Sequence, residues 1–193
     1  MSISLSKGQK ISLAKPSGHN LNRFFIGAGW DVAQSKIGSF FGGGGSSIDL
    51  DVSLICLDAN GEVVETVWFR NLKNSNNSII HKGDNLTGEG EGDDEVITVD
   101  LDNLPKNIKT LVTTISSFRG QTFDRVQNAF CRVVNMEDNV EMAKYNLSES
   151  GNYTSLIISK IQNNHGIWSM TALGVKCMGS TINDLMPEIR KVL

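Results

Sequence analysis

Short apolar or alternating runs, rich in Val, Ile, Thr and aromatic residues, recur along the chain between turn signals. The run VSLICL (52–57) ends at DANG (58–61), which is a hairpin signal, and EVVETVWF (62–69) follows it. The run EVITVDL (95–101) alternates as a strand with one buried face does. Further strand-like runs lie at 108–117, 128–134, 142–147, 154–161 and 167–175. Strands at this spacing, without intervening helices, predict an all-β fold, a two-sheet antiparallel β-sandwich with long loops.

The C-terminal segment, residues 180–193, follows a different period. Thr181 can cap a helix there, and Pro187 lies inside the pattern and predicts that the helix is kinked or divided. We expect this short helix to pack on the sandwich, with docking to a partner as the alternative. The apolar positions at helical spacing are Ile182, Leu185, Met186, Ile189 and Val192.

Length and composition fit one globular domain across residues 1–193. Charged residues make up 20% of the chain and hydrophobic residues 39%, which is not the balance of a disordered protein. Six of the 21 acidic residues lie in one segment, GDNLTGEGEGDDE (83–95), which leaves 15 acidic residues against 18 basic ones elsewhere. That small basic excess contains no basic run, so we expect no nucleic-acid partner.

Three widely spaced cysteines, Cys56, Cys131 and Cys177, form no CxxC pair, and we expect them to be buried, reduced thiols. The N-terminus, MSISLSKGQK, has no apolar region of the kind found in secretory signals. No stretch approaches the ~18 apolar residues of a membrane-spanning helix. Together these observations predict a cytoplasmic protein with no membrane span.

The acidic segment ends a polar connection between the run at 62–69 and the run at 95–101, and a connection this long is unusual unless it is functional. Two like charges about 6 Å apart in water repel by about 0.7 kcal/mol, so six carboxylates held in one turn need a counter-charge unless the loop stays open. Calcium supplies that charge and accepts carboxylate and carbonyl oxygens at flexible angles, whereas magnesium, with stricter geometry, ranks second. Gly88, Gly90 and Gly92 let the backbone turn its carbonyl groups inward.

The segment does not fit an EF-hand. Asp84 and Glu95 have the separation of the first and last ligands of that loop, but Leu86 and Gly88 occupy its third and fifth positions. Glu89 replaces the turn glycine, and the flanking patterns predict strands instead of helices. A calcium site here therefore requires a different architecture.

Further oxygen ligands are available upstream. Asp49 and Asp51 lie two residues apart in SIDLDVSL and so face one side of a strand, which suits either a metal site or a solvent-exposed face. Asp31 follows the bulky Trp30 in GAGWD and is either a third ligand position or a turn or cap residue.

The acidic segment, the upstream GAGWD and IDLDVS, and the downstream QTFDRVQNAFCRVVN together resemble the TerD-like tellurium-resistance and stress-protein family. MAKYNLSE (142–149) and the opening ISLSKGQKISLAK are also similar to it, so the resemblance covers about residues 2–178. It implies a β-sandwich that binds calcium, usually two ions, through loops at one end, in cytoplasmic bacterial stress proteins. The metal residues that the resemblance implies are Asp31, Asp49, Asp84, Asn85, Glu89, Glu91, Asp93, Asp94 and Glu95.

Three features depart from the family pattern. Glu91 stands where the family often has Asp, so its carboxylate reaches one bond further. The insert QSKIGSFFGGGGSS (34–47) is longer than the common spacing and could disturb a ligand set that spans both motifs. The C-terminal INDLMPEIRKVL (182–193) differs from the usual small-residue ending.

These features predict a calcium-binding stress-response or tellurium-resistance protein that acts as an ion-dependent binding module, with calcium and other proteins of a stress complex as partners. We expect no enzymatic activity, because no G-x-S-x-G or HExxH motif appears. His19, His81 and His165 are dispersed and are expected in loops or on the surface. The alternatives are a metal-dependent hydrolase, or a cation-bridged binder of a small ligand such as an oxyanion or a nucleotide.

Overall fold

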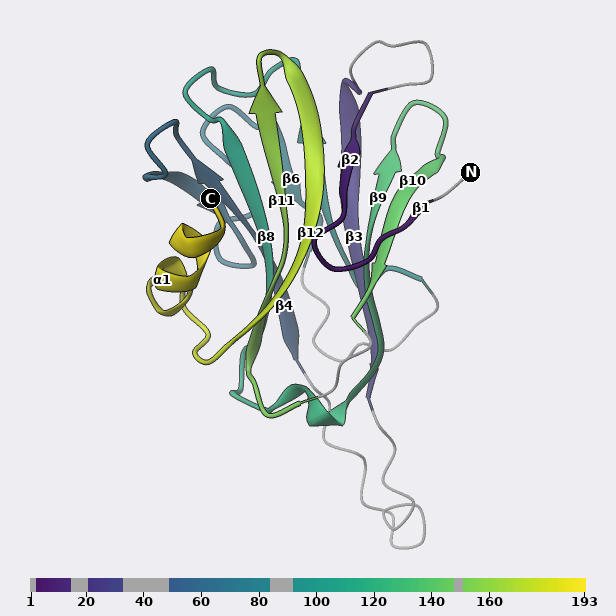
Figure 1. Ribbon diagram of the computed structural model, residues 1–193, viewed down its shortest axis with the longest axis vertical. Helices are drawn as coiled ribbons and strands as arrows, with labels where there is room; N and C mark the ends of the chain where they lie inside the picture. The colour runs from purple at the N-terminus through teal and green to yellow at the C-terminus, as the bar shows by residue number, and fades with distance from the viewer. Residues whose placement is uncertain (1–2, 15–20, 33–48, 84–91, 148–150) are drawn as a thin grey trace, which may run out of the picture.

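The computed structural model describes residues 3–14, 21–32, 49–83, 92–147 and 151–193, which fold into two facing six-stranded sheets (Figure 1). Sheet A contains, in spatial order, β1 (Ile3–Ser4), β10 (Glu141–Asn146), β9 (Val126–Asn135), β3 (Arg23–Val32), β7 (Glu95–Asp100) and β6 (Ile79–His81). Sheet B contains β2 (Lys10–Ser12), β12 (Ile167–Cys177), β11 (Ser155–Asn164), β8 (Thr110–Ser117), β4 (Leu50–Leu57) and β5 (Val63–Val67). A 3-10 turn (Phe123–Arg125) precedes β9, and α1 (Ile182–Val192) follows β12.

The predicted two-sheet architecture is confirmed, with one difference in strand direction. Sheet B is antiparallel throughout, whereas sheet A is mixed because β1 pairs in parallel with β10, Ile3 opposite Ala143. Antiparallel pairing is expected where a short hairpin joins two strands. No such hairpin joins β1 and β10, which come from distant parts of the chain, so the direction of this edge strand was not predictable from local pattern.

Each predicted strand has a counterpart in the structure, whereas the short strands β1, β2 and β6 have no predicted counterpart. The long strand β3 was not predicted either. Its inward positions include Phe24 and Ile26, and these alternate with Gly27 and Gly29 toward the end of the strand. Glycine is depleted in strands because it has no side chain to pack. The glycines therefore concealed the alternation, although they have a specific role at the candidate site.

The main core lies between the sheets. Strand β7 shows the pattern, since Ile97 and Val99 are buried whereas the intervening Val96 and Thr98 are half-buried. Full burial of an aliphatic or aromatic side chain contributes about 1.5–3 kcal/mol. The largest side chains buried in this layer include Phe24, Leu50, Leu54 and Ile79.

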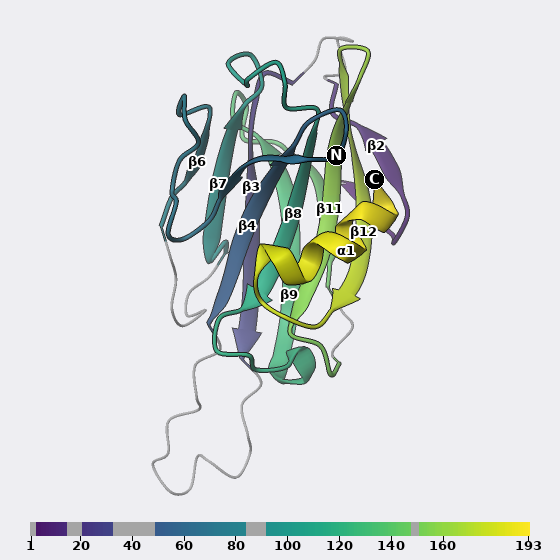
Figure 2. The same cartoon turned by 90° about the vertical axis from the view of Figure 1, so that its left-hand side faces the viewer.

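A smaller apolar cluster lies under α1, which crosses the outer face of sheet B (Figure 2). Leu185 and Ile189 pack on Ile55, Val112 and other side chains of that face, so the prediction that the helix packs on the sandwich is confirmed. Thr181 caps the helix in a capping box with Asp184.

The helix runs through Pro187 without division, contrary to one of the two predicted effects of this proline. A proline lacks the N–H that would bind the carbonyl of the residue four positions earlier, here Asn183. That carbonyl belongs to the first turn of α1, and the remaining turns hold the helix on the sheet through Leu185 and Ile189.

All three cysteines are free and buried, which confirms that prediction. Burial raises the pKa of Cys56 and of Cys131 to about 12. Among the described residues, no helix is long and apolar enough to cross a membrane.

Candidate functional site

Three chain segments that carry predicted metal residues lie near one another at one end of the sandwich (Figure 1). Asp31 lies near the end of β3, Asp49 directly precedes β4, and Asp93, Asp94 and Glu95 lead into β7. The other four predicted metal residues lie outside the described residues: Asp84, Asn85, Glu89 and Glu91.

Two glycines of β3 let the end of the acidic segment lie flat on sheet A. A Cβ at Gly27 would overlap the carboxyl group of Asp93, and a Cβ at Gly29 would lie 2.5 Å from the carbonyl oxygen of Gly92. Neither approach is compatible with a larger residue. The glycines of GAGWD therefore form a surface on which Gly92 and Asp93 rest.

Two hydrogen bonds to main-chain groups of β3 hold the next residue, Asp94, on the same strand. Its N–H donates to the carbonyl of Ala28 at 2.8 Å, and its Oδ2 accepts the Trp30 N–H at 2.8 Å. Because β3 then continues to Asp31, that residue is a strand residue, and its predicted alternative as a turn or cap residue is wrong.

Asp93 pairs with an arginine that the sequence did not single out. Arg132 of β9 binds it at two points, Nε to Oδ1 and Nη2 to Oδ2, each at 2.8 Å. The bonds to Asp93 raise the pKa of Arg132. Glu141 lies 3.4 Å from Nη1 of the same guanidinium. An arginine inside the otherwise mostly apolar run NAFCRVV was the available signal, but nothing local connected it to Asp93.

Asp94 lies among like charges. Partial burial raises the pKa of its carboxyl group, the bond from the Trp30 N–H opposes that shift, and the Asp31 and Asp93 carboxylates add to it. Asp31 itself accepts a hydrogen bond from Asn128 Nδ2 at 2.7 Å. The structure therefore brings Asp31, Asp93 and Asp94 within electrostatic reach of one another.

Glu95 points into the interior instead. Its Oε2 accepts the Val52 N–H from the opposite sheet at 2.7 Å and lies 3.3 Å from His81 Nε2, and both side chains are fully buried. On the other side of the ring, His81 Nδ1 accepts the Gly83 N–H at 3.2 Å.

The expectation that His81 is a surface or loop residue is wrong. It ends a three-residue strand, in which it shares the inward face with Ile79, and a strand this short gives too little alternation to show that in sequence. His165, in contrast, is exposed in a turn as expected. His19 lies outside the described residues.

Asp49 and Asp51 are both buried, which excludes the solvent-exposed face as their setting. Asp49 Oδ2 lies 3.9 Å from Nε of the exposed Arg119. Within the described ranges, no group of three or more His, Cys, Asp or Glu side chains is arranged to hold a metal ion. These residues fit a hard cation in one respect: oxygen ligands of like charge converge beside the segment that carries the remaining acidic residues.

Comparisons with known proteins identify the family of the chain. The model of the TerD domain matches residues 1–188. Tellurium resistance protein TerZ of Serratia marcescens is 47% identical over 189 residues, covering 97% of this chain and 96% of that protein. Stress response protein SCP2 of Bacillus subtilis is 40% identical over 197 residues, covering 96% and 98%.

A solved structure has the same fold. A homologue of telluride resistance protein (TerD) from Streptomyces coelicolor A3(2) superposes with a TM-score of 0.68 over 86% of this chain and 96% of its own, at 19% identity. That likeness shows the fold alone, whereas the sequence matches extend over nearly the whole chain. The chain belongs to the TerD domain family.

Proposed function

We propose that this protein is a tellurium-resistance or stress-response protein that binds calcium, two ions, at the acidic end of its sandwich. Its relatives carry those two names, and the observation that supports calcium is the cluster of Asp31, Asp93 and Asp94. Asp93 and Asp94 are partly buried and Asp31 is exposed. A divalent cation stabilises carboxylates that repel one another, because it replaces repulsion with attraction.

Within this proposal the described acidic residues have two roles. Asp31 accepts a hydrogen bond from Asn128 and Asp94 accepts one from Trp30, and both would offer oxygens to an ion. Asp93 and Glu95 instead hold the segment in place, through Arg132 and through Val52 and His81. The remaining oxygens would come from Asp49 and from the residues of the acidic segment, Asp84, Asn85, Glu89 and Glu91.

The proposed role is binding, not catalysis, in the cytoplasm. Calcium would join the acidic segment to β3, and the joined surface would then bind other proteins of a stress response. An ion that binds only the folded state stabilises it by about 2.7 kcal/mol at about 100 times its Kd. For a chain of this length that corresponds to a rise in Tm of roughly 5–10 °C.

Thermal unfolding tests the proposal. We expect EDTA to lower the Tm of the purified protein and calcium to restore it, with magnesium less effective at the same concentration. An unchanged Tm in EDTA and in calcium would contradict calcium binding. Circular dichroism at 20 °C, recorded with and without EDTA, separates loss of the ion from loss of the fold.

A further inference from the structure

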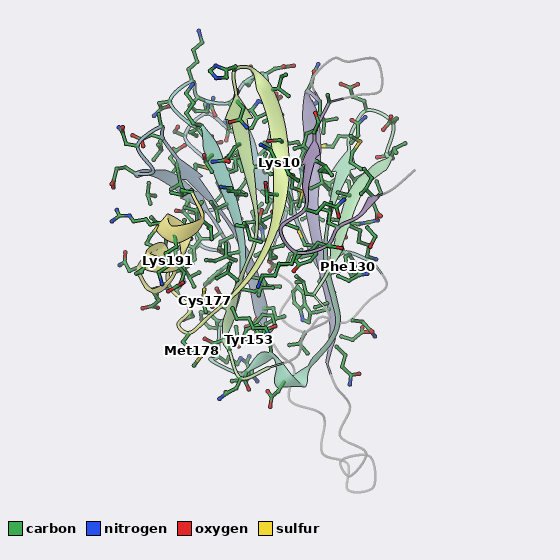
Figure 3. All side chains as sticks on the ribbon, in the orientation of Figure 1. Lys10, Phe130, Tyr153, Cys177, Met178 and Lys191 are labelled. Atoms are coloured by element: carbon green, nitrogen blue, oxygen red, sulfur yellow. The ribbon has the colours of Figure 1, made fainter. Side chains whose placement is uncertain are left out.

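A polar cavity of about 630 Å³ lies at the same end of the molecule, on the outer side of sheet A. Phe130 and Lys144 alternate with the core residues Cys131 and Ala143, so they face outward, and Phe130 lies on the right-hand sheet in Figure 3. The volume is within the range of about 300–1,000 Å³ typical of small-molecule sites. Its polar and aromatic lining comprises Asp124, Gln127, Asn128, Phe130, Lys144 and Asn146.

Lys144 gives this cavity a cation. Its Nζ lies 4.0 Å from the centroid of the Phe130 ring, which holds the ammonium group against an aromatic face. Among the described residues, no carboxylate lies within ion-pair distance of Lys144. Asp124, elsewhere in the lining, accepts a hydrogen bond from the Thr122 hydroxyl. The cavity therefore contains one positive and one negative group that do not pair with each other.

Asn128 connects the cavity to the acidic cluster. It lines the cavity, and its Nδ2 donates to Asp31 Oδ2 at 2.7 Å. The backbone φ of Asn128 is +51°, in the left-handed region that favours glycine, although Asn128 lies within β9. A non-glycine residue keeps such a conformation only where the surrounding structure holds it in place. Residues of this kind are concentrated at binding sites.

We propose that this cavity binds a small phosphorylated ligand, with Lys144 on the phosphate and the side-chain amides of Gln127 and Asn146 on the rest of the molecule. Lysine is a common phosphate-binding residue that acts as a point charge, and amides bind hydroxyl and carbonyl groups. The inference rests in part on the proposed calcium function, because Asp31, which Asn128 links to the cavity, repels a phosphate until a cation neutralises it.

Two consequences follow for affinity. The charges of Lys144 and Asp124 offset each other, so the cavity alone attracts a phosphate only weakly. Calcium at the neighbouring acidic cluster removes repulsion and makes phosphate binding tighter. Because coupling between two ligands is reciprocal, the phosphorylated ligand tightens calcium binding by the same factor. Asn128 transmits part of this effect, since its amide contacts both the cavity and Asp31.

Calorimetric titration with glucose 6-phosphate tests the proposal, with glucose and inorganic sulfate as comparison probes. We expect glucose 6-phosphate to bind at least tenfold more tightly with calcium than with EDTA, and more tightly than glucose or sulfate. Equal affinity for sulfate would show a simple anion site and overturn the claim of a cavity-filling ligand. Absence of glucose 6-phosphate binding to a protein that takes up calcium would overturn the inference and leave the proposed function intact.

Substitutions of two lysines test whether glucose 6-phosphate binds in this cavity. Lys144→Gln should weaken glucose 6-phosphate binding at least tenfold while its calcium titration stays unchanged, and Lys144→Arg should retain binding. Lys106→Gln is the matched control, since Lys106 is an exposed lysine in the connection between β7 and β8, near the opposite end of the sandwich. Equal binding by the Gln variants of Lys144 and Lys106 would overturn the site.

Asn128→Gly tests the connection to calcium. Glycine keeps the left-handed backbone and removes only the amide, so the variant should fold normally and bind glucose 6-phosphate with a smaller calcium effect. An undiminished calcium effect would remove Asn128 from the coupling. If the wild-type protein binds glucose 6-phosphate equally tightly in EDTA and in calcium, the coupling itself is overturned. If calcium does not bind at all, the proposed function is rejected separately.

Discussion

Arg132 and Asp93 form a two-point ion pair across Gly27, with Nε–Oδ1 and Nη2–Oδ2 distances of 2.8 Å. Arg132 belongs to β9, Asp93 precedes β7, and β3 lies between them, so the pair joins the acidic segment to a strand two positions away in sheet A. The guanidinium also lies over the Phe25 ring at 5.9 Å. The pair therefore fixes where the acidic segment ends.

Arg132→Met should destabilise the fold by about 2 kcal/mol. The side chain of Asp93 is only 8% exposed, so the variant leaves a nearly buried charge without its guanidinium. The cost stays below the ~3–5 kcal/mol of a fully buried pair because the Arg132 side chain is 31% exposed. Urea unfolding measures the difference in free energy.

Arg190→Met is the matched control for that measurement. Arg190 pairs with Glu62 at 3.3 Å, but both side chains are more than half exposed, and surface pairs contribute ~0–1 kcal/mol. Equal effects of the two substitutions would show that the Arg132–Asp93 pair has no special role.

Gly27→Ala should displace the acidic segment, because the new Cβ would overlap the Asp93 carboxyl group. We expect a loss of stability of roughly 1–3 kcal/mol, as for other overpacked sites. Asp93→Ala removes the overlapping atoms, so Gly27→Ala should cost less in that background than in the wild type. Urea unfolding of the four proteins measures the coupling, and additive effects would contradict direct contact.

Cysteine labelling should report on α1. With a pKa of about 12, only on the order of one in ten thousand Cys56 or Cys131 thiols is ionised at pH 8, so both should react slowly in the native protein. Cys177, labelled in Figure 3, lies in the cluster under α1. Burial raises its pKa as well. Leu185→Ala should loosen the helix and expose Cys177 first, which mass spectrometry of labelled peptides can show. Labelling of all three thiols at one rate would instead indicate global unfolding.

Local alternation located strands β4, β5 and β7 to β12 and the helical period of α1, because each of these patterns repeats over enough residues to be recognised. It missed β3, where Gly27 and Gly29 replace outward side chains, and it missed the inward direction of His81 in a strand of three residues. The acidic residues were located by composition alone. Their partners Arg132 and Asn128 come from β9, which pairing with β3 brings to the site across about 100 residues of chain.

The contacts that hold the end of the acidic segment also depend on main-chain N–H groups, which the sequence does not distinguish from one another. The Asp94 carboxylate binds the main-chain N–H of Trp30, and Glu95 binds that of Val52. Every residue except proline can present such an N–H, so only the register of β3, β4 and β7 identifies the donors.

Calorimetric calcium titration of the wild type beside Asp94→Asn tests the central claim most directly, with Asp102→Asn as the control. Asp102 is an exposed aspartate just beyond β7, so its replacement changes the net charge equally without altering the cluster. We predict that the wild type and Asp102→Asn bind two calcium ions alike, and that Asp94→Asn loses one of them or binds it at least tenfold more weakly. Calcium uptake that is absent from the wild type, or identical in all three proteins, would contradict the account.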